Sequence, residues 1–201
     1  MKNALFSPLL LALLATPASA ALLTFDSLGD RAAVPAGYGG MVWENWYSLN
    51  VLTYNLKPTG YEAGLISSPN VAYNGGGAPA SFSSGTPFML GGFYLAAAWY
   101  DDLAVDVVGK YLGVPLHSVT FYPRATFATL FVLGWTGIDE VSFTTRGGTQ
   151  HPGYPGSGEH VALDNIFIDE MPTIGIPEPA AWTLIGFGTA ALALARRRRA
   201  Q

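Results

Sequence analysis

The stretch Phe88–Lys110 reads FMLGGFYLAAAWYDDLAVDVVGK, and its pattern decides the fold class. Residues 93–100 are apolar or aromatic at every position, which fits a buried strand or a short buried helix. The flanking glycines, the aromatic side chains and the Trp-Tyr-Asp-Asp ending favour the strand. Residues 103–110 then alternate with a period of two, which indicates a second strand directly after the first.

Short apolar or alternating runs recur every 10 to 15 residues on both sides of this stretch, bounded by turn residues. The pattern predicts an all-β fold, a two-sheet antiparallel sandwich of jelly-roll or galactose-binding-like topology. We expect a turn at 134–137 and a Gly/Pro loop at 147–158. The predicted strands are 22–25, 41–47, 63–67, 71–73, 80–83, 88–90, 93–100, 103–110, 117–122, 126–133, 138–144 and 160–168.

The charge of the body and the lack of cysteine exclude several classes of function. Residues 21–175 hold five basic and thirteen acidic side chains, a net charge of −8, against −4 for the whole chain. An acidic body argues against a nucleic-acid partner, because binding a polyanion requires a basic face. The absence of cysteine excludes disulfides, thiolate metal sites and a thiol nucleophile.

Residues 1–20 have the order of a secretory signal peptide. A positive residue precedes the apolar run Leu5–Ala15, and the small residues Ala18-Ser19-Ala20 follow as a cleavage site. The apolar run is shorter than the roughly 20 residues that cross a bilayer, so it is not a membrane span. The alternative to a signal peptide is a buried N-terminal helix. We therefore predict an N-terminal signal helix, export, and an extracellular β-sandwich domain over 21–170.

The C-terminus consists of a linker at 171–176 and a three-part tail at 177–201. The uncharged run 180–195 would be about 24 Å long as a helix, which just reaches across the hydrocarbon core when flanking arginines snorkel. We expect a C-terminal transmembrane helix there, with the basic end in the cytoplasm. The flanking parts are the triplet Pro177, Glu178 and Pro179, and the cluster Arg196, Arg197, Arg198 and Arg199.

This tail resembles the PEP-CTERM sorting domain, in which a Pro-Glu-Pro triplet precedes an apolar helix and an arginine cluster. The resemblance implies an exosortase partner, a membrane transpeptidase of Gram-negative bacteria. It also implies a transient stay in the inner membrane, cleavage near the triplet, and a final place at the cell surface or in an exopolysaccharide or biofilm matrix. The alternative is a plain membrane anchor. The body resembles uncharacterised β-sandwich modules that often precede such tails, through Thr24-Phe25-Asp26, residues 37–43, Asn74–Gly77 and Leu163–Ile166.

Oxygen-bearing side chains suggest a Ca²⁺ site as the candidate cofactor site of the body. Asp26 ends the first predicted strand, and Asp164 and Asn165 lie in the last, so pairing of these two strands would bring the three together. Glu159 or a loop carbonyl would complete the shell. His160 precedes Asp164 by four residues, which also allows a mixed His/Asp metal site. Alternatively, Asp26 caps a turn and Asp164-Asn165 flank a bend in the strand.

Aromatic side chains suggest a glycan site, with exopolysaccharide as the partner. The candidates are Trp43, Trp46, Trp99 and Tyr100. Trp43 and Trp46 would face opposite sides of one strand, so they cannot share a platform. The alternative is that all are core aromatics. A closed surface with Trp43 and Trp99 both buried would argue against glycan binding and catalysis alike.

Hydrolysis is the remaining class, as in a secreted jelly-roll carbohydrate-active hydrolase. The carboxylate pairs Asp101-Asp102 and Asp139-Glu140 are sequence neighbours, so on strands they point to opposite faces and form no natural acid/base dyad. Neither a Gly-x-Ser-x-Gly nor a His-Glu-x-x-His motif occurs, and the three histidines are scattered. We therefore expect a non-enzymatic protein.

Overall fold

The computed structural model describes residues 20–172. Nearly all of the predicted signal peptide, and the whole predicted sorting tail with the helix predicted at 180–195, lie outside the described residues. Within residues 20–172, no helix has both the length and the apolar character needed to cross a bilayer.

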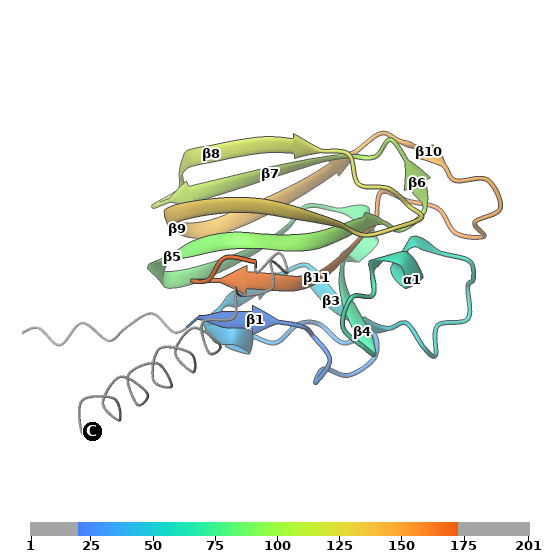
Figure 1. Cartoon of the computed structure of the whole chain (residues 1–201), viewed down its shortest axis with the longest axis horizontal. Helices are drawn as coiled ribbons and strands as arrows, with labels where there is room; N and C mark the ends of the chain where they lie inside the picture. Colours follow the sequence, from blue (N-terminus) through green and yellow to red (C-terminus); the bar gives the residue numbers. More distant parts are fainter. Residues whose placement is uncertain (1–19, 173–201) are drawn as a thin grey trace, which may run out of the picture. The chain divides into compact units, whose positions relative to one another are not determined.

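The described residues confirm the predicted all-β class and its antiparallel strands (Figure 1). Every ladder is antiparallel, and β1 pairs with β11, as expected for the first and last strands. The strands are β1 Ala21–Leu23, β2 Val42–Glu44, β3 Trp46–Asn50, β4 Asn70–Asn74, β5 Ala80–Ala97, β6 Tyr100–Asp101, β7 Ala104–Tyr111, β8 Val114–Phe121, β9 Thr129–Arg146, β10 Thr149–Gln150 and β11 Val161–Ile168. One helix, α1 Gly60–Gly64, and the 3₁₀ turns Tyr38–Gly40 and Gly75–Gly77 complete the list.

Two long strands, β5 and β9, run through both layers of the sandwich. Residues 80–83 of β5 and 140–146 of β9 belong to a layer ordered β2-β5-β9-β7-β8. Residues 90–97 of β5 and 129–135 of β9 belong to a layer ordered β3-β4-β11-β5-β9, with β1 also beside β11. The layers face each other, since the Phe93 and Phe143 rings meet at 5.4 Å. The finer jelly-roll or galactose-binding-like topology stays a prediction.

The turn predicted at 134–137 is wrong, because β9 continues through it. Gly134 and Gly137 have φ angles of 63° and 72°, and the register of the β5–β9 ladder shifts around them. Glycine reaches these left-handed angles without steric cost, so it bends the strand rather than ending it. The strand breaks predicted between residues 83 and 93 are likewise irregularities within β5.

The second half of β5 is buried on both faces, which explains its unbroken apolar sequence. Phe93, Leu95 and Ala97 point into the core between the layers. Ala96 and Ala98 point to the opposite face, into a second apolar cluster that includes Tyr61 of α1. A strand covered on both sides needs apolar residues at odd and even positions alike.

The strand predicted at 63–67 is also wrong, because α1 begins just before it. Thr59 and Glu62 form a capping box, in which the Thr59 hydroxyl accepts a hydrogen bond from the Tyr61 N–H and Glu62 accepts from the Thr59 N–H. The helix lies close against β5, since a Cβ on Gly60 would be 1.7 Å from the Ala97 carbonyl oxygen. The capping box favours a helix here more strongly than the weak alternation of residues 63–67 favours a strand.

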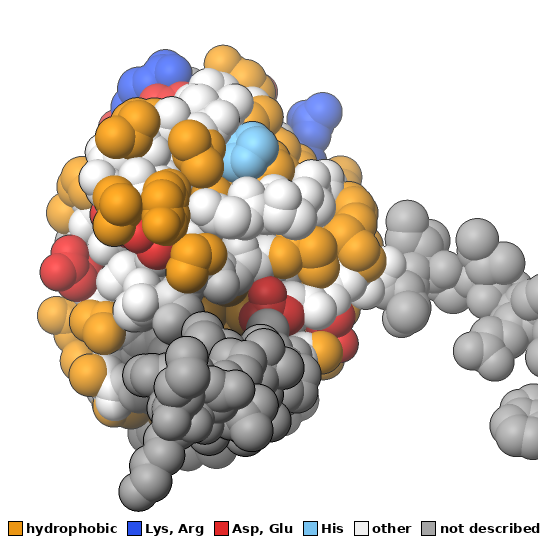
Figure 2. All heavy atoms as spheres, turned by 90° about the vertical axis from the view of Figure 1, so that its left-hand side faces the viewer, with side chains coloured by type: hydrophobic (Ala, Val, Ile, Leu, Met, Phe, Trp, Pro, Cys, Tyr) orange, Lys and Arg blue, Asp and Glu red, His pale blue; other side chains and the backbone are white. Residues whose placement is uncertain are grey.

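Exposed apolar side chains also lie around the β7–β8 turn, at the end of the sandwich away from α1. The β7–β8 turn lies at the left of Figure 1 and α1 at the right. Leu112 and Val114, at the β7–β8 turn, are 76% and 61% exposed. Figure 2 views the molecule from this left-hand side, and apolar side chains are spread over it among polar ones.

Asp164, on β11, is a fully buried carboxyl that ties the chain before β4 to the sheet. Its Oδ2 accepts hydrogen bonds from the N–H groups of Ile66 and Ser67, both at 2.8 Å, and its Oδ1 accepts from the Asn165 N–H at 2.8 Å. The Ser67 hydroxyl lies 3.1 Å from Oδ1. Removing an acceptor from buried donors is costly, so this carboxyl holds residues 66–67 in place.

Replacing Asp164 by Asn should lower the free energy of unfolding by about 1–3 kcal/mol near pH 5, because the amide NH₂ must face at least one backbone N–H. Urea unfolding measures the change. The matched control is Asp102→Asn, an exposed aspartate with no side-chain hydrogen bond among the described residues, which should change stability by less than about 0.5 kcal/mol. Equal effects at both positions would contradict the role of Asp164.

The difference in the free energy of unfolding between wild type and Asp164→Asn should decrease as the pH rises. Burial raises the pKa of Asp164 to about 7, against the lowering effect of its N–H donors. An unfolded aspartate has a pKa of about 3.9, so between these values only the folded state holds the proton. The contribution of Asp164 to the free energy of unfolding is therefore full below about pH 3.9 and is lost as the pH rises through 7. Urea unfolding at several pH values should show the gap between wild type and Asp164→Asn shrinking from about pH 5 to about pH 8; a widening gap would contradict the raised pKa.

Candidate functional site

A pocket of about 540 Å³ opens beside α1, on the face of the β3-β4-β11-β5 layer that lies away from the core between the layers. Three chain segments contribute to its walls together with the strands: the segment between β1 and β2, the loop before α1 and the loop before β11. The lining residues are Arg31, Leu49, Tyr54, Asn55, Leu56, Tyr61, Tyr73, Trp99, Gly156, Ser157 and His160. The pocket is thus mainly aromatic, with a few polar groups.

Tyr61 organises the aromatic wall. Its ring makes edge contacts with Tyr54 at 5.6 Å, Trp99 at 5.5 Å and Tyr73 at 5.8 Å. Burial raises the pKa of the Tyr61 hydroxyl well above its usual value, and a hydrogen bond with Trp99 opposes the shift. Edge-to-face packing of this kind fixes ring orientations, so the rings present defined surfaces to the pocket.

Two partly buried tyrosines and one histidine form the outer wall. Burial raises the pKa of both Tyr54 and Tyr73, and the positive charge of Arg31 opposes the shift in each. The imidazole of His160 lies 6.3 Å from the Tyr73 ring. Burial lowers the pKa of His160 below 6.5, so this side chain is neutral at pH 7. The pocket wall therefore has one charged side chain among the described residues, Arg31.

The loop predicted at 147–158 forms one side of the pocket and is well held. Gly156 lies directly on Trp99, since a Cβ there would be 2.5 Å from the indole ring. The Gln150 amide donates to the carbonyl oxygens of Tyr154 and Gly156 at 2.9 and 2.8 Å. The Tyr154 hydroxyl donates to the Ala125 carbonyl oxygen at 2.9 Å. These bonds position the loop against Trp99.

Two of the four predicted glycan-binding residues lie in the core. Trp43 is 8% and Trp46 1% exposed, and both pack between the layers. The prediction that they face opposite sides is also wrong, because Asn45 between them has a φ of 56° and breaks the alternation. Neither contributes to the pocket.

The other two predicted residues lie at or near the pocket. Trp99 is 4% exposed, yet its ring forms part of the pocket wall. Tyr100 is half-buried, pairs with Gln150 of β10 and packs against both apolar clusters without lining the pocket. Trp43 and Trp99 are thus both buried, but a pocket opens beside Trp99.

The candidate Ca²⁺ residues have structural contacts instead. Asp26 accepts a hydrogen bond from the Asn70 N–H at 3.2 Å, and both oxygens of Asp164 accept from N–H donors. Asn165 has a φ of 49° in the irregular part of β11, and its side-chain oxygen is buried without a hydrogen-bond partner. Within residues 20–172, no three His, Asp or Glu side chains are placed to hold a metal ion.

Three of the four carboxylates considered for hydrolysis are engaged elsewhere, and Asp102 is exposed outside the pocket. Asp101 pairs with His151 at 2.7 Å, and Glu140 pairs with Lys110 at 2.7 Å. Asp139 accepts a hydrogen bond from the Leu112 N–H at 2.9 Å. No carboxylate lines the aromatic pocket in the described part of the chain. His117 stacks on Trp135, with ring centroids 5.1 Å apart.

Sequence reasoning missed most of the pocket residues, including Arg31, Tyr54, Tyr61 and Tyr73. They come from separate segments, so no spacing pattern connects them. The available signal was the group of three tyrosines at positions 54, 61 and 73, with Asn55 beside the first. Tyr54 and Tyr61 lie outside the predicted strands, and connecting segments carry a disproportionate share of binding residues.

Comparisons with known proteins find similar folds among solved structures. No family model and no curated protein matches the chain. The crystal structure of a DUF4465 family protein from Bacteroides caccae matches 75% of this chain and 99% of its own, with 11% identity and a TM-score of 0.53. A DUF4465 family protein from Bacteroides ovatus matches 77% and 95%, with 9% identity and a TM-score of 0.42. The carbohydrate-binding module TmCBM61, in complex with β-1,4-galactotriose, matches 70% and 98%, with 11% identity and a TM-score of 0.37.

The likeness to the Bacteroides caccae protein agrees with the strand ladders in defining a class of fold. The body of this chain is an antiparallel β-sandwich. At this identity the likeness concerns the fold alone, and the function has to be argued from the pocket.

Proposed function

We propose that this chain is an exported, non-enzymatic β-sandwich protein of the cell surface or exopolysaccharide matrix, and that it binds glycans in the aromatic pocket. The observation that supports this function is the pocket itself. Its volume of about 540 Å³ is in the range of small-ligand sites, and its walls combine rings with a few polar groups.

Sugar rings suit this combination. The C–H faces of a pyranose pack on aromatic rings, and its hydroxyls need hydrogen-bond partners. Tyr54 and Tyr73 offer ring surface, while the tyrosine hydroxyls, Asn55 and Ser157 offer polar atoms. Because Tyr61 and the loop at 147–158 fix these groups, little ordering is needed on binding.

The sequence supports delivery to the outside of the cell. The signal peptide directs export, and the tail resembles one that an exosortase recognises and cleaves. The alternative, a secreted jelly-roll hydrolase, requires two carboxyl groups across a cleft. No carboxylate lines the pocket among the described residues, so binding without hydrolysis is the function that this site favours.

Replacing Tyr54 by Ala should weaken glycan binding about tenfold or more, equivalent to about 1.4 kcal/mol, because it removes an outer wall of the pocket. A glycan array identifies a ligand for the full chain, and titration calorimetry then compares the proteins. Tyr122→Ala is the matched control, since Tyr122 is 61% exposed and lies outside the pocket. If no glycan bound the wild-type protein, or if both variants bound equally well, the proposed function would be wrong.

Processing of the tail is tested by mass spectrometry of the protein from cells that contain an exosortase. We expect a mature chain that begins at Ala21 and lacks Arg196–Arg199. Replacing Pro177, Glu178 and Pro179 by alanine should leave the arginines in place, since the recognition triplet is then lost. A wild-type chain that retains the arginines in such cells would refute cleavage.

A further inference from the structure

We propose that the pocket selects acidic sugars and that Arg31 binds their carboxylate. This inference rests on the proposed glycan-binding function and adds the class of sugar. The structure brings together three features that support it: a guanidinium held at the pocket wall, a wall without carboxylates, and an acidic body around it.

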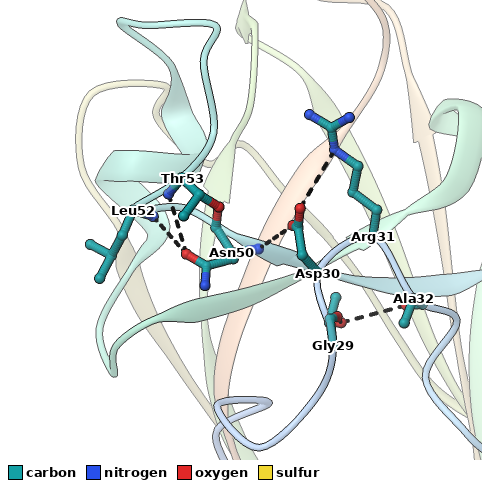
Figure 3. Close-up of polar contacts among 8 residues, drawn as sticks. Gly29, Asp30, Arg31, Ala32, Asn50, Leu52 and Thr53 are labelled. Carbon is teal, nitrogen blue, oxygen red and sulfur yellow. Dashed lines mark hydrogen bonds and ion pairs between the residues drawn. The ribbon is translucent and has the colours of Figure 1, made fainter.

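Arg31 is held in place by a short chain of contacts. Its Nε lies 4.0 Å from Asp30 Oδ2, and Asp30 Oδ1 accepts a hydrogen bond from the Asn50 N–H at 2.8 Å. The Asn50 side chain in turn accepts from the N–H groups of Leu52 and Thr53 at 3.1 and 3.3 Å. Figure 3 shows this arrangement, with the two terminal nitrogens of Arg31 directed away from Asp30. The Asp30 contact is made through Nε at 4.0 Å and leaves the terminal nitrogens of Arg31 available.

The guanidinium also lies over an aromatic wall of the pocket. Its central carbon is 5.7 Å from the centroid of the Tyr54 ring, within the range of a cation–π contact. A sugar packed in the pocket near Tyr54 would thus have the terminal nitrogens of Arg31 beside it. A planar guanidinium matches a carboxylate with two parallel hydrogen bonds, which an ammonium cannot do.

The charges around the pocket favour one local contact over a general attraction. The body has a net charge of −8, so it repels a polyanion at long range. Arg31 is the one charged side chain on the pocket wall among the described residues, because His160 is neutral at pH 7. Preference for an acidic sugar must therefore come from Arg31 itself.

Matched ligands test this inference. Oligosaccharides of polygalacturonate, alginate and hyaluronan are each titrated into the full chain, alongside the same oligosaccharides with carboxyl-reduced or methyl-esterified residues. At least one acidic form should bind about tenfold tighter than its neutral counterpart, as expected for a charge-assisted pair. Arg31→Gln should abolish this preference while neutral binding stays, and Arg31→Lys should restore only part of it.

Controls separate the local contact from charge and from folding. Arg146→Gln removes the same charge at an exposed ion pair with Asp106, outside the pocket, and should keep the preference. The side chain of Arg31 is 59% exposed, so thermal melting of Arg31→Gln should match wild type. A further control compares the affinities for dextran sulfate and for neutral dextran. If dextran sulfate bound more tightly than dextran by the same factor, the site would bind anions in general rather than recognise carboxylates.

The outcomes distinguish this inference from the proposed function. If no acidic or neutral oligosaccharide binds, the glycan function itself fails. Should neutral forms bind as tightly as acidic ones, or Arg31→Gln keep the preference, glycan binding stands and the acidic-sugar inference is overturned. Loss of the preference in Arg31→Gln but not in Arg146→Gln supports it.

Discussion

Burial of β5 on both faces is the constraint on which the rest of the structure depends. One face closes the core between the two layers through Phe93 and Leu95, and the other accepts α1 over Ala96 and Ala98. Without cysteine, the fold is held by such burial, at roughly 25 cal/mol per Å² of apolar surface. The pocket follows from the same arrangement, because α1 on the outer face is what places Tyr61 among the other rings.

Small residues matter to the pocket as much as its aromatic walls. Gly60 and Gly64 let α1 approach the sheet, since a Cβ at these positions would be 1.7 Å from the Ala97 oxygen and 2.5 Å from the Ala162 Cβ. Gly156 does the same for the loop against Trp99. Any side chain at these three glycines would push a wall of the pocket outward, so the shape of the site is specified by where side chains are missing.

The sequence predicted what depends on local pattern and missed what depends on distant contacts. Alternation and turn residues identified the all-β class and the antiparallel sandwich, whereas the pairing of the first and last strands entered only as a condition of the Ca²⁺ hypothesis. The glycines at 134 and 137 predict a turn, but they bend β9 instead, since sequence alone does not distinguish a bulge within a long strand from a break between two. Among the site residues, Trp99 was predicted from its residue type, but the same criterion also selected Trp43 and Trp46, which lie in the core. Their burial depends on the left-handed Asn45 and on partners far away in the chain.

Asp164 illustrates why residue type alone does not assign chemistry. A carboxylate and an amide on the last strand, near an aspartate from the first, have the composition of a cation site. In the fold, donors from the backbone of residues 66 and 67, nearly a hundred positions earlier, bind one oxygen of this carboxyl. Arg31 is the converse case: its neighbour Asp30 looks like a simple ion-pair partner, but the pair is exposed and contributes little to stability. The pair leaves the guanidinium at the pocket wall, where its central carbon lies 5.7 Å from the centroid of the Tyr54 ring. In this body, then, the buried acidic group serves the fold, and the exposed basic one is the group to which we assign recognition.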